Sequence, residues 1–346
     1  MSDGSGRVVK ILSIDGGGIR GLIPALVLRE IERRLGEAGR ARPFASIFDL
    51  IAGTSSGALI ALGLALPATP ARGSDPRIGG PAREPALSMN DIVDFFARRG
   101  HEIFPPSLGR KLRTTVQAFR HKYDGLGFEK VLAETFGEAT LKDALTNLLI
   151  TSFDSESLEP CCLKNRPYRP EWADDDNFYM RDAARASSAA PTFFSPGLIS
   201  PVPDNGTKFC LIDGSIFANN PALLAYIEAT KIFPEAEEFM VLSLGTGDDP
   251  YGFPYEEIAK WGFIEWINPM KRLPLWSMMS AGQNASVNHM LGRIAGVRYF
   301  RISGTLECCN AGMDDASPAA VSDLRGAAED IIRSHEADIE SLVHML

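Results

Sequence analysis

The sequence predicts an α/β fold in which a mostly parallel sheet is covered by helices on both faces. Two segments near the N-terminus, residues 8–35 and 48–66, each combine a short apolar strand, a glycine-rich turn and a helix. Further apolar strand segments alternate with helical patterns along the rest of the chain. Such alternation is typical of a parallel sheet that is buried on both faces.

The first unit begins with residues 8–14, which are rich in β-branched side chains and are followed by the glycines at 16–18. This short, apolar, glycine-bounded run predicts a buried strand. Apolar residues then recur near helical spacing at Leu22, Leu26, Ile31 and Leu35. The intervening charged residues predict a helix with one face in solvent.

The second unit has a strand at residues 48–52, a turn at Gly53–Gly57 and an apolar stretch from Ala58 to Leu66. That stretch is apolar on every face, which predicts a buried helix. Residues 67–85 contain five prolines and three glycines. We expect a flexible surface loop over residues 67–88, with a lid over a binding site as the functional alternative.

The remaining elements follow the same rules of length and periodicity. Helices are predicted at residues 91–99, 127–136 and 221–231, and strands at 148–153, 209–212 and 240–244. Residues 317–346 predict one or two amphipathic helices packed on the rest of the protein.

Composition limits the function. The chain has 346 residues, and 35 basic against 44 acidic side chains give a net charge of −9, which argues against binding DNA or RNA through a basic face. The five cysteines show no metal-ligand spacing, so neither a zinc site nor a disulfide framework is expected. The longest apolar stretch is far below the about 20 residues that span a bilayer. We therefore expect a cytoplasmic protein whose membrane contact is peripheral.

Gly53–Gly57 fits the pattern G-x-S-x-G between a strand and a helix. In this context the serine occupies a strained turn, and Gly53 and Gly57 remove side chains that would clash with it. Ser55 is thus a candidate nucleophile at a helix N-terminus, where the dipole favours a developing alkoxide. The alternative is a glycine-serine turn without chemistry.

Residues 16–21 allow two interpretations. Gly16, Gly18 and Gly21 satisfy G-x-G-x-x-G, the dinucleotide-binding pattern, which also requires an acidic residue at the end of the second strand. No acidic residue is there. The favoured alternative is an oxyanion hole formed by the backbone N–H groups of Gly16, Gly17 and Gly18.

A serine nucleophile needs a base, and none of the five histidines lies in a motif-like setting. Asp213 follows the predicted strand at residues 209–212 and precedes Gly214. Because we place it at the carboxyl end of a strand, it is a candidate general base that accepts the Ser55 proton directly. The alternative is an aspartate that only forms a turn.

Five segments, in this order, resemble the motifs of the patatin-like phospholipase family. They are Asp15–Gly21, Gly53–Gly57, Arg185–Phe193, Asp213–Ser215 with Ala218–Pro221, and Leu242–Gly247. The resemblance covers about residues 8–250 and implies a three-layer α/β/α sandwich, with residues 1–346 as one catalytic domain.

The resemblance also implies roles for individual residues. Ser55 would be the nucleophile, Asp213 the base, and the amides of residues 16–18 the oxyanion hole of a lipid acyl hydrolase. Arg20 aligns with the family's basic residue in the glycine loop, while Gly53, Gly57 and Gly214 support the two turns. Ser215 departs from the glycine or alanine of many members. No cofactor or metal is implied.

Within the family the chain most resembles short bacterial members that a cyclic dinucleotide activates in anti-phage signalling. That resemblance implies a cyclic dinucleotide activator and hydrolysis of membrane phospholipid at the inner membrane. Two alternatives stay open: a catalytically silent lipid-binding scaffold, and a Rossmann-type protein that binds a dinucleotide at residues 16–21.

An aromatic stretch follows the last motif and contains Trp261, Trp266 and Trp276. We expect core packing or a subunit interface, which would make the protein a homodimer. The alternatives are an acyl-chain pocket or a membrane-docking surface, for which Lys271 and Arg272 would suit lipid headgroups.

Overall fold

The computed structural model describes residues 7–69, 84–105, 121–165, 177–249, 252–268, 273–307 and 312–346. The strands are β1 Val8–Ile14, β2 Leu50–Thr54, β3 Asn147–Asp154, β4 Glu159–Lys164, β5 Gly197–Ile199, β6 Phe209–Asp213, β7 Glu238–Leu244 and β8 Val297–Ile302. The helices are α1 Leu22–Glu37, α2 Phe44–Ile47, α3 Ser56–Ala65, α4 Met89–Ala97, α5 Gly100–Ile103, α7 Leu126–Phe136, α8 Met180–Ser187, α9 Ser215–Ala218, α10 Ala222–Ile232, α11 Tyr255–Ile258, α12 Phe263–Trp266, α13 Pro274–Leu291, α14 Pro318–Ser334 and α15 Glu336–Met345. Two 3-10 turns, η1 Gly18–Gly21 and η2 Leu141–Asp143, complete the described elements.

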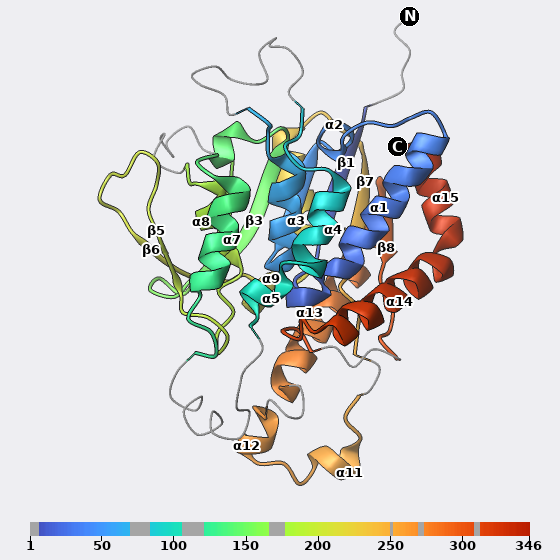
Figure 1. The fold of residues 1–346 in the computed structure, drawn as a ribbon. Helices are drawn as coiled ribbons and strands as arrows, with labels where there is room; N and C mark the ends of the chain where they lie inside the picture. The colour runs from blue at the N-terminus through green and yellow to red at the C-terminus, as the bar shows by residue number, and fades with distance from the viewer. Residues whose placement is uncertain are drawn as a thin grey trace, which may run out of the picture.

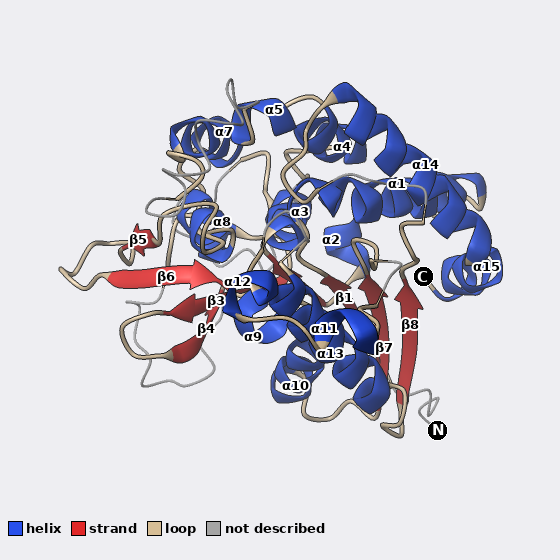
Figure 2. Ribbon diagram, turned by 90° about the horizontal axis from the view of Figure 1, so that it is seen from below, coloured by secondary structure: helices blue, strands red, loops and turns tan. Residues whose placement is uncertain are grey.

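The central sheet has the strand order β5-β6-β3-β2-β1-β7-β8, and β4 pairs with β3 outside this path. The pairs from β3 through β2, β1 and β7 to β8 are parallel, whereas β3–β4, β3–β6 and β5–β6 are antiparallel. The predicted mostly parallel sheet is confirmed. Helices cover both faces of the sheet (Figures 1 and 2), as three-layer α/β/α packing requires.

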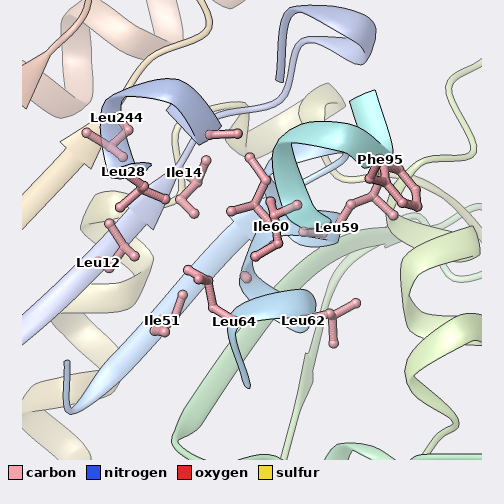
Figure 3. Packing of buried hydrophobic residues seen from close by; sticks show 14 of the residues in the cluster. Leu12, Ile14, Leu28, Ile51, Leu59, Ile60, Leu62, Leu64, Phe95 and Leu244 are labelled. Atoms are coloured by element: carbon pink, nitrogen blue, oxygen red, sulfur yellow. The ribbon is translucent and has the colours of Figure 1, made fainter. Parts of the chain in front are cut away.

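Successive residues of a strand face two different hydrophobic cores, one on each side of the sheet. In β1, Leu12 and Ile14 belong to the larger core, whereas Val9 and Ile11 belong to the smaller one on the opposite face. This alternation follows from the two-residue period of a strand. Figure 3 shows the larger core, where β1, β2 and β7 meet α1, α3 and α4. All ten residues of α3 are buried, which confirms the helix predicted to be apolar on every face.

The other predicted elements are also present, with ends shifted by a few residues. The strand predicted at residues 48–52 is β2, which starts at Leu50, and the helix predicted at residues 91–99 is α4, which starts at Met89. The C-terminal segment forms α14 and α15. Helix α14 packs on α1 and buries Leu324 and Ile331, so the amphipathic prediction is confirmed.

Two predictions concern residues that are only partly described. Most of the proline-rich loop, residues 70–83, and the pair Lys271 and Arg272 lie outside the described residues. At the base of the loop, the Ala68 N–H donates to the Glu84 carbonyl oxygen at 2.9 Å. Across the described helices, none combines the length and apolarity needed to cross a bilayer.

Strand β6 is one of the antiparallel strands of this mostly parallel sheet, and its pairing decides where Asp213 lies. Only the last residues of β3 pair with β6, with Ser152 opposite Asp213 and Asp154 opposite Leu211. The end of β6 therefore coincides with the carboxyl end of β3, although the two strands run in opposite directions. Asp213 reaches the predicted edge of the sheet because this overlap is short.

Candidate active site

Ser55 occupies a strained turn between β2 and α3. Its backbone angles are φ 54° and ψ −121°, in a region that residues with a side chain rarely adopt. A Cβ on Gly53 would lie 2.3 Å from the Gly57 carbonyl oxygen, and one on Gly57 would lie 2.2 Å from the Ile14 carbonyl oxygen. Both glycines are therefore required by close backbone approach, as the G-x-S-x-G pattern predicts.

The turn presents Ser55 at the N-terminus of α3. The Ser55 N–H donates to Ser187 Oγ at 2.9 Å, and the Ser55 carbonyl oxygen accepts from the N–H groups of Ala58 and Leu59. Ser187 comes from α8, within the Arg185–Phe193 motif, so that motif holds the serine turn in place. The Ser55 residue is only 8% exposed, and the positive end of the α3 dipole lies beside it.

Asp213 is almost fully buried at the end of β6. The Ser215 N–H donates to Asp213 Oδ1 at 2.9 Å. Burial raises the pKa of Asp213 to about 6, while the interactions with Ser215 and with the Ser55 hydroxyl partly offset that rise. A carboxylate in this state titrates close to neutral pH, where a general base works best.

Thr151 on β3 explains how β2 and β6 bring these two residues together. Its hydroxyl lies 2.7 Å from Thr54 Oγ1, immediately before Ser55. A Cβ on Gly214 would lie 2.3 Å from Thr151 Oγ1, so glycine lets the chain after Asp213 approach β3 closely. The predicted supporting role of Gly214 thus has a steric basis.

The glycine loop lies against the Ser55 turn, since a Cβ on Gly16 would come within 3.2 Å of Ser55 Cβ. The prediction for the Gly16 amide is wrong, because its N–H donates to the Asn219 carbonyl oxygen at 3.1 Å. The N–H groups of Gly17 and Gly18 have no hydrogen-bond partner within the described part of the chain. Within the glycine loop, these two amides are the candidates to bind an oxyanion.

Later motifs hold the glycine loop in its conformation. Thr246, from the motif after β7, donates its hydroxyl to the Gly16 carbonyl oxygen at 2.8 Å, and the Asp15 N–H donates to the Leu244 carbonyl oxygen. Asn219 holds Gly16 from the other side. The segments around residues 16, 55, 187, 213, 219 and 246 therefore converge at one edge of the sheet.

Sequence reasoning missed a buried ion pair beneath this loop. Arg301 on β8 binds Asp15 through two hydrogen bonds, of 3.0 Å and 2.6 Å, and also donates to Ser243 Oγ at 2.8 Å. The side chains are 15% and 1% exposed, for Arg301 and Asp15 respectively. Burial raises the pKa of Asp15, and the Arg301 guanidinium opposes this rise. No local signal marks Arg301, because it lies 286 residues along the chain from its partner.

Arg20, the basic residue of the glycine loop, is 6% exposed. Its guanidinium lies 3.3 Å from Asp249 Oδ1, so the charge is held next to the chain that follows β7. Within the described residues, no group of histidine, cysteine, aspartate or glutamate side chains could hold a metal ion.

The structure does not favour the dinucleotide interpretation of residues 16–21. In that interpretation the turn into the first helix should leave its N–H groups to the pyrophosphate. Here the Ile19 N–H donates to the Met313 carbonyl oxygen at 2.8 Å. A Cβ on Gly18 would lie only 2.1 Å from the same oxygen. A backbone carbonyl group thus occupies the space beside the turn.

Comparison with known proteins supports the same interpretation. A sequence model of the patatin-like phospholipase family matches residues 12–226. Patatin-like protein 2 of Arabidopsis thaliana is 32% identical over 368 residues, which cover 96% of this chain and 85% of that protein. Patatin-T5 of Solanum tuberosum is 32% identical over 356 residues, which cover 95% of this chain and 84% of that protein.

One further relative and one solved structure also match this chain. A protein of Solanum tuberosum named probable inactive patatin-3-Kuras 1 is 32% identical over 355 residues, which cover 95% of this chain and 87% of that protein. The crystal structure of VipD from Legionella pneumophila aligns with 95% of this chain and 67% of its own, at 12% identity and a TM-score of 0.39. The family match spans β2 to β6, including the Ser55 turn and Asp213, and the chain therefore belongs to the patatin-like phospholipase family of lipid acyl hydrolases.

Proposed function

We propose that the protein releases fatty acids from membrane phospholipids through a dyad of Ser55 and Asp213. The observation that carries the proposal is the buried carboxylate of Asp213, whose pKa burial raises to about 6 and the Ser55 hydroxyl partly lowers. The strained Ser55 turn supports the proposal, as do the N–H groups of Gly17 and Gly18, which have no partner among the described residues. Membership of the family supplies the class of substrate.

The first half of the reaction forms an acyl-enzyme. Asp213 accepts the hydroxyl proton as Ser55 Oγ attacks the carbonyl carbon of the ester. The N–H groups of Gly17 and Gly18 donate to the tetrahedral oxyanion, and each such donor contributes about 3 kcal/mol to transition-state stabilisation. The intermediate then collapses, and the leaving alkoxide of the lysophospholipid takes the proton from Asp213.

The second half releases the fatty acid. Asp213 accepts a proton from a water molecule, which attacks the acyl carbon on Ser55 Oγ. The same two amides stabilise the second oxyanion. When this intermediate collapses, the fatty acid leaves and the Ser55 oxygen recovers the proton from Asp213.

The decisive experiment measures fatty-acid release from mixed phospholipid vesicles by the wild type, Ser55→Ala and Asp213→Asn. Both substitutions should lower the rate by about 10³-fold or more, because dyad members act as a unit. Ser56→Ala is the matched control. The Ser56 hydroxyl is buried next to the nucleophile and has no hydrogen-bond partner among the described residues, so its loss should leave the rate nearly unchanged. Activity that survives both dyad substitutions would refute the dyad.

Two finer predictions are tested in the same assay. Activation by a cyclic dinucleotide, as in the bacterial anti-phage members, rests on the sequence resemblance and would appear as a rate increase with one nucleotide of a panel. A rate of fatty-acid release that no nucleotide of the panel changes would contradict that prediction. A folded wild type that binds vesicles but hydrolyses no lipid would instead support the silent scaffold.

A further inference from the structure

The segment after the last motif forms an apolar arm, defined as the described residues 252–268 and 273–291, with helices α11, α12 and α13. Neither α11 nor α12 buries any residue, and α13 buries only its ends, Pro274 and Leu291. Large apolar side chains of the arm that are 37–77% exposed are Tyr255, Phe263, Ile264, Ile267, Leu275, Met278, Met279 and Met290. The prediction of core packing for this stretch is therefore wrong.

The C-terminal half of α13 fastens the arm beside the candidate active site. Gln283 donates to the Ile216 carbonyl oxygen and accepts from the Asn219 N–H, both at 3.1 Å. Asn219 is the residue that holds Gly16 in the glycine loop. Tyr299 anchors the next turns by donating to Asn288 Oδ1 at 2.6 Å. The base of the arm is thus part of the framework around Ser55 and Asp213.

The free end of the arm projects from the edge of the sheet that carries the site. Figure 1 shows α11 and α12 beyond the end where α9 lies and α1 begins, and Figure 2 shows them in front of that same edge. At a rise of 1.5 Å per residue, Pro274 lies about 14 Å along α13 from Gln283. Phe263 and Ile264, which are 77% and 73% exposed, belong to the short helix α12 next to this free end.

The arm carries few charged side chains. In the sequence, α13 contains no Asp, Glu, Lys or Arg over 18 residues. The arm contains three acidic residues, Glu256, Glu257 and Glu265, and one basic residue, Lys260, so its net charge is 1 − 3 = −2. Trp261 packs edge-on against Phe253 and Trp266, both at 5.2 Å between ring centroids. Tryptophan is enriched where apolar surface meets lipid headgroups.

We propose that the apolar arm is the docking surface for a zwitterionic phospholipid bilayer, so that insertion of α12 brings the Ser55 edge against the lipid. The proposal rests on the proposed function, since it assigns the surface from which that site takes its substrate. A bilayer fits better than a second copy of the chain, because a subunit seated on this edge would cover the approach to Ser55. The excess of acidic over basic side chains in the arm fits neutral headgroups rather than anionic ones, which would repel it.

The test uses the full chain carrying Ser55→Ala, which separates binding from turnover. Binding to phosphatidylcholine vesicles is measured by sedimentation, with and without the double substitution Phe263→Ser and Ile264→Ser. We expect the double substitution to weaken binding by about tenfold or more, since two exposed apolar side chains no longer enter the interface. Leu198→Ser is the matched control. Leu198 is 64% exposed on β5, the first strand in the sheet order, and it is not part of the arm. Its replacement should leave vesicle binding unchanged.

A second measurement separates this proposal from the proposed function. With Ser55 intact, the double substitution should slow hydrolysis of vesicles about as much as it weakens binding, and leave hydrolysis of a soluble short-chain ester unchanged. If no variant hydrolysed lipid, not even one with Ser55 intact, but the double substitution still weakened vesicle binding, the result would count against the dyad and not against docking. Unchanged vesicle binding, or a shift from dimer to monomer in analytical ultracentrifugation on substitution, would overturn the docking proposal.

Discussion

Replacing Asp213 by asparagine should abolish hydrolysis and stabilise the folded protein, because the buried carboxylate costs folding free energy at neutral pH. Its pKa is raised from 3.8 to about 6 by burial. A carboxyl with a raised folded-state pKa holds its proton more tightly in the folded chain than in the unfolded one. Stability therefore falls as pH rises from about 4 through 6, and the full penalty is present above 6.

The size of the effect follows from the shift. Each pKa unit is worth about 1.4 kcal/mol, so a shift of about two units costs about 3 kcal/mol at pH 7.5. At pH 4.5 the folded carboxyl is almost fully protonated while the unfolded one is mostly ionised, and the penalty is about 1 kcal/mol. Asparagine can still accept from the Ser215 N–H, so Asp213→Asn should remove the penalty without breaking the turn.

The assay is urea denaturation of the wild type and Asp213→Asn at pH 4.5 and 7.5. The free energy of unfolding of the variant, relative to the wild type, should increase by about 2 kcal/mol between the two pH values. Asp330→Asn, in an exposed ion pair, is the control and should show no such change. A variant whose relative stability is the same at both pH values would refute the burial argument. The expected loss of activity with a gain in stability is a trade-off often met at functional sites.

Three further predictions follow from the site. The value of kcat/KM should rise with pH through about 6 as Asp213 ionises, and a pH-rate profile flat between pH 5 and 7 would contradict its role as base. Gly17→Ala places a Cβ 2.3 Å from Thr246 Oγ1, which should displace the backbone amides of the glycine loop. We therefore expect kcat to fall by about 10²-fold. An unchanged kcat in a folded variant would exclude Gly17 from the oxyanion hole. Arg301→Met leaves Asp15 buried without its ion pair and should destabilise the protein by about 3–5 kcal/mol in urea denaturation, with part of the loss recovered when Asp15→Asn is added. Equal unfolding midpoints for Arg301→Met and the double variant would show that the two side chains are not coupled.

Local features could be predicted because their causes lie close together in the chain. The turn at Gly53–Gly57 needs only a strand before it, a helix after it and glycines where backbone atoms approach closely. The alternation of apolar residues in β1 and the fully apolar α3 likewise carry their own signals. The ordered motifs located Ser55 and Asp213 for the same reason.

The sequence did not decide features that depend on residues far apart in the chain. The Gly16 N–H could not be excluded as an oxyanion donor without knowing that Asn219 accepts it. For the aromatic stretch the sequence left core packing and a membrane-docking surface both open, because such a stretch has the same composition in a core as on a docking surface.

By itself, the sequence determined the fold class, the strained serine turn and the family, since these depend on short-range periodicity and on glycines placed next to functional side chains. Only the tertiary structure decided that β6 runs antiparallel and still brings Asp213 to Ser55, and that Arg301 pairs with Asp15 beneath the glycine loop. Such pairings depend on which distant segments become neighbours when the sheet forms. Packing also decides which backbone N–H groups are used up inside the fold and which remain for a substrate.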